Sequence, residues 1–141
     1  MKHLKKFNES YEAEKRIEDI CLELEDICLE LKDACTKVDI DKANIFFLPY
    51  DSNIVSKALE YKDLYRCIYL DNRYFHSLLG WPELKDCLLR IKEYLYPLVK
   101  DVEFFYSFSI YMEYKKFDLN DNTEIEEIPL FIMIIFGIKE L

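Results

Sequence analysis

Glycine and proline are scarce in this sequence, which has two glycines and four prolines among its 141 residues. Gly80 and Gly137 stand far apart, which excludes a glycine-rich phosphate-binding loop, because such a loop needs several glycines close together. The same scarcity leaves little room for long flexible linkers. Because half of the residues are hydrophobic, a packed core is expected, and residues 1–141 are predicted to form a single domain.

A long hydrophobic run is also missing. The longest apolar stretch, residues 128–138, is shorter than the roughly 20 residues that a membrane-spanning helix needs, so no membrane association is expected. No segment has the pattern of a secretory signal peptide, and the number of cysteines is odd. These features predict a cytoplasmic protein in a reducing compartment.

The spacing of the cysteines argues against a metal site or a disulfide framework. Cys21, Cys28 and Cys35 recur every seven residues, which on one helix separates neighbours by about 10.5 Å along the axis. Thiolates that ligate one metal must converge on a point, and a disulfide needs its two Cα atoms within about 7 Å. The three cysteines are therefore interpreted as small core residues.

Positive charge is too sparse for a nucleic-acid backbone to be the ligand. The chain carries a net charge of −9, and twelve acidic against four basic residues lie between Glu9 and Asp41. Binding phosphates needs a basic patch, so direct nucleic-acid binding is not expected. The concentrated acidity suits a basic protein partner, and it equally suits a solvated helix face that only keeps the protein soluble.

That acidic segment has the period of an amphipathic helix. Its apolar residues recur every three or four positions, at Ile17, Ile20, Leu24, Ile27, Leu31, Ala34 and Val38. The spacing predicts a helix over residues 9–38, preceded by a short basic lead at residues 1–8. Leu22 and Leu29 fall outside this apolar face and form a second, narrower stripe.

The remaining patterns predict an α+β fold. Strands are expected at residues 45–48, 65–70, 102–114 and 128–138, and a second helix is expected to begin at Pro82. Residues 55–59 also allow a helical turn. The order helix-strand-strand-helix-strand-strand suggests a four-stranded, mostly antiparallel sheet with both helices on one face. The last strand is apolar on both faces and is expected at the centre, whereas Phe105 and Tyr111 are expected on the exposed face of the sheet.

No group of residues reaches the standard of a catalytic motif. His76 and Ser77 are adjacent and cannot adopt the geometry of a base and its nucleophile. Residues 118–129 resemble a calcium loop only in part, because Thr123 replaces its glycine and Pro129 its final glutamate. The expectation is a protein that is not an enzyme and has no cofactor and no metal. A ligand site built from Arg66, His76, Tyr106 or Tyr114 is the least supported alternative.

The favoured hypothesis is a non-enzymatic interaction protein that acts through its acidic helix. Leu22 and Leu29 are its expected apolar anchors, surrounded by Glu18, Glu25, Asp26 and Asp33. The alternative is a self-assembling module in which the same stripe forms a homodimer.

The first ten residues, Met-Lys-His-Leu-Lys-Lys-Phe-Asn-Glu-Ser, resemble the start of many small uncharacterised proteins of tailed bacteriophages and Bacteroidetes genomes. The resemblance covers about the first forty residues and includes Leu31-Lys32-Asp33. It implies a phage-encoded accessory protein in a bacterial host cell, including one that inhibits a host protein. It transfers no functional residues.

Overall fold

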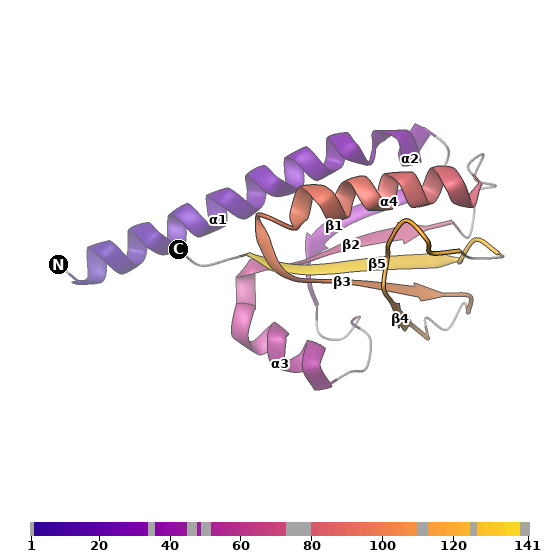
Figure 1. Cartoon of the computed structure of the whole chain (residues 1–141). Coiled ribbons are helices and arrows are strands. Elements are labelled where there is room, and N and C mark those ends of the chain that lie inside the picture. The colour runs from indigo at the N-terminus through magenta and orange to yellow at the C-terminus, as the bar shows by residue number, and fades with distance from the viewer. Residues whose placement is uncertain are drawn as a thin grey trace.

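Five antiparallel strands form one sheet in the described part of the chain, in the spatial order β1-β2-β5-β3-β4 (Figure 1). The computed structural model describes residues 2–33, 36–44, 48, 52–72, 80–109, 113–124 and 127–138. The strands are β1 (Lys37–Lys42), β2 (Tyr65–Asp71), β3 (Val99–Ser107), β4 (Lys115–Phe117) and β5 (Phe131–Ile138). The helices are α1 (Lys2–Ile27), α2 (Leu29–Asp33), α3 (Ser52–Tyr61) and α4 (Trp81–Leu95), with a 3-10 turn, η1 (Lys62–Leu64).

The predicted α+β class is confirmed, but the four-stranded layout with two helices on one face is not. α1, α2 and α4 cover one face of the sheet, whereas α3 lies against the opposite face (Figure 1). Residues 55–59, where the sequence allows a helical turn, lie within the longer helix α3. The additional strand β1 arises because Lys37–Asp41 alternates charged residues with the β-branched Val38 and Ile40, a period of two that favours a strand. Of the strand expected at residues 45–48, residues 45–47 lie outside the described residues.

The first helix differs from its predicted bounds at both ends. α1 begins at Lys2, inside the predicted basic lead, because no glycine or proline interrupts the sequence there. It ends at Ile27, and α2 follows from Leu29 to Asp33. Cys28 stands between them, although its N–H still donates to the carbonyl of Leu24 at 2.9 Å. The helix therefore stops before Val38, which belongs to β1.

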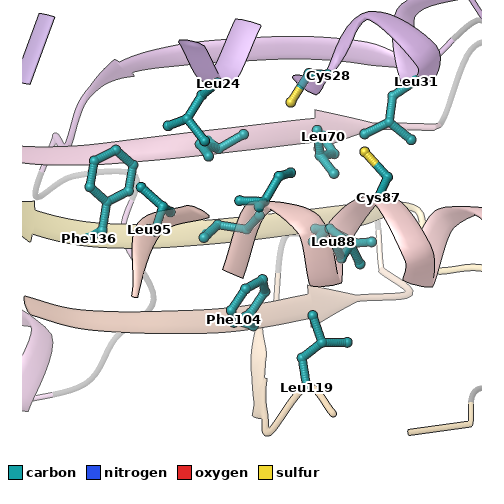
Figure 2. Packing of buried hydrophobic residues seen from close by; sticks show 14 of the residues in the cluster. Leu24, Cys28, Leu31, Leu70, Cys87, Leu88, Leu95, Phe104, Leu119 and Phe136 are labelled. Atoms are coloured by element: carbon teal, nitrogen blue, oxygen red, sulfur yellow. The ribbon is translucent and has the colours of Figure 1, made fainter. Parts of the chain in front are cut away.

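The main core lies between the sheet and the helices α1, α2 and α4. The predicted apolar face of the first helix is confirmed, since Ile17, Leu24 and Leu31 are fully buried. In Figure 2, Leu24, Cys28 and Leu31 share one cluster with residues of α4 and the sheet, including Leu70, Cys87, Leu88, Leu95 and Phe136. The predicted stripe of α4 is confirmed as well, and Pro82 lies in its first turn.

β5 is the central strand, as its sequence predicts. All eight of its residues are buried, because β2 and β3 flank it and helices cover both faces of the sheet. Strands covered on both faces lose the alternation of polar and apolar residues. The run Phe131–Ile138 is therefore continuous and apolar.

A second, smaller core lies under α3 and corrects the expectation for Phe105. Phe105 is 2% exposed and packs with Ile54, Tyr65, Met133 and Ile135. The sequence places Phe105 on the face opposite the main core, which is right. That face is covered at this position because the apolar residues of α3 pack on it.

The third strand is shorter than its alternating pattern predicts. β3 ends at Ser107, and its partner β4 returns alongside it, with Phe117 opposite Phe104. The Ser107 hydroxyl accepts the N–H of Ser109 at 3.1 Å, and this side-chain bond offers the backbone an alternative to the ladder. Tyr111, the second residue expected on an exposed sheet face, lies outside the described residues.

Gly137 makes room for Tyr61, the last residue of α3. A Cβ atom at Gly137 would lie 2.7–2.8 Å from carbons of the Tyr61 ring. Gly137→Ala is therefore expected to lower the free energy of unfolding by about 1–3 kcal/mol through overpacking, measured by urea denaturation. In a Tyr61→Leu background the same alanine is expected to cost clearly less. An equal cost in both backgrounds would contradict the steric explanation.

Candidate partner-binding surface

The six residues predicted to bind a partner are all exposed on the first helical segment. Leu22 on α1 is 63% exposed and Leu29 on α2 is 51% exposed, which is high for leucine. The four acidic residues of the set, Glu18, Glu25, Asp26 and Asp33, are exposed as well. The structure therefore keeps these side chains available, but it brings only some of them together.

Glu18, Leu22 and Glu25 line one hollow between α1 and the sheet. The hollow has a volume of about 330 Å³, and Cys21, Ile40 and Arg66 complete its described lining. Their spacing of four and three residues places the three α1 side chains on one side of the helix. Ile40 comes from β1 and Arg66 from β2, so three separate elements form this hollow. We call it the helix-side hollow.

Arg66 gives the helix-side hollow a buried positive charge. It is 8% exposed, and its Nη1 donates to the backbone carbonyls of Asp63 and Tyr65, the latter at 3.3 Å. Burial raises the pKa of the Cys21 thiol above its ordinary value, while the charge of Arg66 and its hydrogen bond to this thiol act in the opposite direction. Arg66 is thus held by the protein itself, and the two glutamates remain at the rim.

Leu29, Asp26 and Asp33 do not line this hollow. Leu29 and Asp33 belong to α2, which lies beyond the interruption at Cys28. The nearby Glu30 pairs with Arg90 of α4 at 2.5 Å, which ties α2 to α4. The stripe predicted as one continuous surface is therefore divided, and the geometry favours its Leu22 part.

The sequence alone missed the contribution of β1. Ile40 is not among the predicted site residues, because the helical spacing of apolar residues continues to Val38 and assigns residues 37–38 to the helix. On the opposite face of the sheet, β1 also borders a second hollow of about 480 Å³, lined by residues that include Asp39, Asp41, Tyr69 and Met133. We call it the α3-side hollow. The alternation of charged and β-branched residues from Lys37 to Asp41 is the signal that identifies this strand.

The structure does not assemble the alternative ligand site. Arg66 lies on the α1 side of the sheet, whereas Tyr114 packs with the smaller core on the α3 side. Tyr106 makes edge-on contacts with Phe108 and Phe117, at centroid distances of 5.5 and 5.3 Å. His76 lies outside the described residues. The remaining three side chains are thus not gathered in one place.

Among the described residues, no group of three or more His, Cys, Asp or Glu side chains is placed to hold a metal ion. In the same part of the chain, no helix has both the length and the apolar character needed to cross a membrane. Two hollows, of about 330 and 480 Å³, border β1 on its two faces in the described part of the chain. Comparison with known proteins found no matching family model, curated protein or solved structure, so these surfaces are the basis for assigning a function.

Proposed function

We propose that this chain is a non-enzymatic interaction protein that binds a positively charged protein partner through the helix-side hollow. The observation that supports this proposal is Leu22, a large apolar side chain that is 63% exposed and lies beside Glu18 and Glu25 in a hollow. An apolar anchor with a charged rim is the usual composition of a protein contact. The acidic rim sets the sign of charge that the partner must carry.

The same charges disfavour the alternative of a symmetric dimer through this surface. In such a dimer each patch meets its own copy, so Glu18 and Glu25 of one molecule would face the same carboxylates of the other. Like charges brought together at an interface cost several kcal/mol. A basic partner removes this repulsion.

Leu22→Glu is expected to reduce partner binding about tenfold or more while leaving the free energy of unfolding within about 0.5 kcal/mol. The reason is that Leu22 is mostly exposed in the free protein and becomes buried only in the complex. The matched control is Leu59→Glu on α3, since Leu59 is 67% exposed on another helix. Binding is measured by the yield of a specific adduct from a photo-crosslinking residue.

One protein carries the crosslinking residue at position 26, next to the helix-side hollow. A second protein carries it at position 96, in place of the exposed Tyr96. The proposal expects one partner that crosslinks from position 26 only, and less of it in Leu22→Glu or at high salt, which screens exposed charges. An adduct that is equally strong from position 96, or unchanged by Leu22→Glu, would contradict the proposed function.

A further inference from the structure

Among the described strands, β1 is an edge strand of the sheet. Within the described residues it pairs only with β2. The N–H of Ala43 donates to the carbonyl of Tyr65 at 3.0 Å, and this bond fixes the pattern of the antiparallel ladder. Asp41 and Asp39 lie two and four residues before Ala43, and backbone groups of a strand alternate in direction, so their N–H and C=O groups also point toward β2. Val38 and Ile40 are out of phase, so their N–H and C=O groups point away from the sheet.

One outward group on this edge is already satisfied. The N–H of Lys42 donates to the Oδ1 of Asp41 at 2.7 Å. The outward groups of Val38 and Ile40 therefore form the central part of the edge. A peptide that pairs with this edge would gain main-chain hydrogen bonds there, as in other cases of strand addition.

The two hollows lie on opposite faces of this edge. Ile40 reaches the helix-side hollow beside Leu22, whereas Asp39 and Asp41 reach the α3-side hollow, which also contains Tyr69 and Met133. Side chains of a strand alternate between the two faces of a sheet. Successive side chains of an added strand would therefore enter the two hollows alternately.

The charges decide what kind of strand fits. The described lining of the two hollows together contains five carboxylates and three cations. Arg66 and Asp71 are buried, so four carboxylates and two cations remain, and Lys37 pairs with Asp39 at 3.8 Å. A basic side chain can lay its aliphatic stem along Ile40 and Leu22 and bring its charge to Glu18 and Glu25. On the other face, the α3-side hollow offers Tyr69 and Met133 to an apolar or aromatic side chain.

We propose that β1 binds an extended segment of a partner protein in which basic residues alternate with apolar ones. The segment adds a sixth strand to the sheet, with its basic side chains toward α1 and its apolar side chains in the α3-side hollow. This inference rests on the proposed function and specifies the partner and its binding mode. A second copy of this chain is the poorer occupant, because its own β1 edge carries the same acidic α1.

The test uses a peptide of about eight residues in which arginine alternates with valine and phenylalanine. The control peptide has the same composition, with all its arginines grouped at one end. The alternating peptide is expected to bind about tenfold more tightly by calorimetry. It is also expected to slow hydrogen exchange at the amides of Val38 and Ile40, measured by NMR, and to leave Asp39 and Asp41 unchanged because they already bond to β2.

Ile40→Pro isolates the main-chain contribution. Proline removes the outward N–H of Ile40 without removing a bond to β2. Edge strands tolerate proline at positions where the N–H points away from the sheet. The matched control Ile40→Ala also shortens the side chain but keeps the N–H. The proline variant is expected to bind the alternating peptide about tenfold more weakly than the alanine variant. Val38→Pro and Val38→Ala serve as a second pair if Ile40→Pro does not fold.

The outcomes separate this inference from the proposed function. If Leu22→Glu abolishes partner crosslinking but the peptide leaves Val38 and Ile40 unprotected, strand addition is wrong and the helix-side contact stands. Equal binding of the two peptides, or of the proline and alanine variants, also overturns strand addition. So does protection of Val38 and Ile40 without peptide in a protein of doubled solution mass, because a second copy then occupies the edge.

Discussion

Replacing Lys57 and Lys116 together by methionine is expected to lower the free energy of unfolding by about 3–5 kcal/mol. Both ammonium groups lie 3.1 Å from the same Oε1 atom of Glu103, whose side chain is only 10% exposed. The other carboxylate oxygen, Oε2, is buried and has no hydrogen-bond partner among the described residues. Removing both cations leaves a buried carboxylate without the two ion pairs that the described residues give it. Urea denaturation followed by circular dichroism measures the loss.

One single variant and one rescue variant identify the cause. Lys116→Met alone is expected to cost less than about 1 kcal/mol, because the Lys116 side chain is half exposed and Lys57 remains. Adding Glu103→Gln to the double methionine variant is expected to restore part of the lost stability, since the amide carries no charge. A double variant as stable as the parent protein would show that the charge of Glu103 is satisfied in another way.

Raising the pH from 9 to 11 is expected to destabilise the protein strongly through two buried thiols. Cys28 and Cys87 are fully buried between the helices and the sheet (Figure 2). Burial raises the pKa of Cys28 from 9.0 to about 12, with a smaller contribution from Cys87, and raises the pKa of Cys87 to about 11. The unfolded chain therefore ionises first.

The sign and size of this effect follow from proton linkage. Below pH 9 the thiols are protonated in both states, so their contribution to stability is fully present. Above pH 9 the folded state holds more protons than the unfolded state, and each thiol removes about 1.4 kcal/mol per pH unit. The two together remove roughly 5 kcal/mol by pH 11, and the loss through Cys28 continues to about pH 12.

A variant with Cys28→Ala and Cys87→Ala is the control for this prediction. It is less stable at pH 7 because two core side chains are truncated, but its stability is expected to fall less steeply above pH 9. Burial also raises the pKa of the Tyr65 phenol above its ordinary value of 10.0, so this tyrosine adds to the loss of stability at higher pH. The slopes are therefore compared between pH 9 and pH 10, where most of the tyrosine ionisation is avoided. Equal slopes in the two proteins would exclude the thiols as the cause.

Long periodic segments allowed much of the fold to be predicted. The buried stripe from Ile17 to Leu31, the stripe of α4 and the central position of β5 all follow from the spacing of apolar residues. Errors arose where two periods meet. Val38 continues the helical spacing of the residues before it and also begins the alternation of β1, and a local pattern cannot decide between the two. Tertiary pairing with β2 decides in favour of the strand.

The site was less accessible to sequence reasoning because it depends on distant parts of the chain. The exposure of Leu22 follows from its place outside the apolar stripe of α1, and this part was predictable. Its neighbours Ile40 and Arg66 come from strands whose positions relative to α1 are set by the sheet order. Likewise, the burial of Phe105 depends on α3. Sequence patterns do not say which face of the sheet the apolar side of α3 covers.

The position of β5 has a consequence for how the chain is made. On the ribosome, β2 and β3 are finished well before residues 131–138, which must insert between them. At about 5–20 residues per second, the interval from Ser107 to Ile138 lasts roughly 2–6 s. Until β5 has been added, the inner edges of β2 and β3 lack the strand with which they pair in the folded protein. The pairing of the sheet can therefore be completed only after the last of these strands has been synthesised, because β5 contributes the ladders to both β2 and β3.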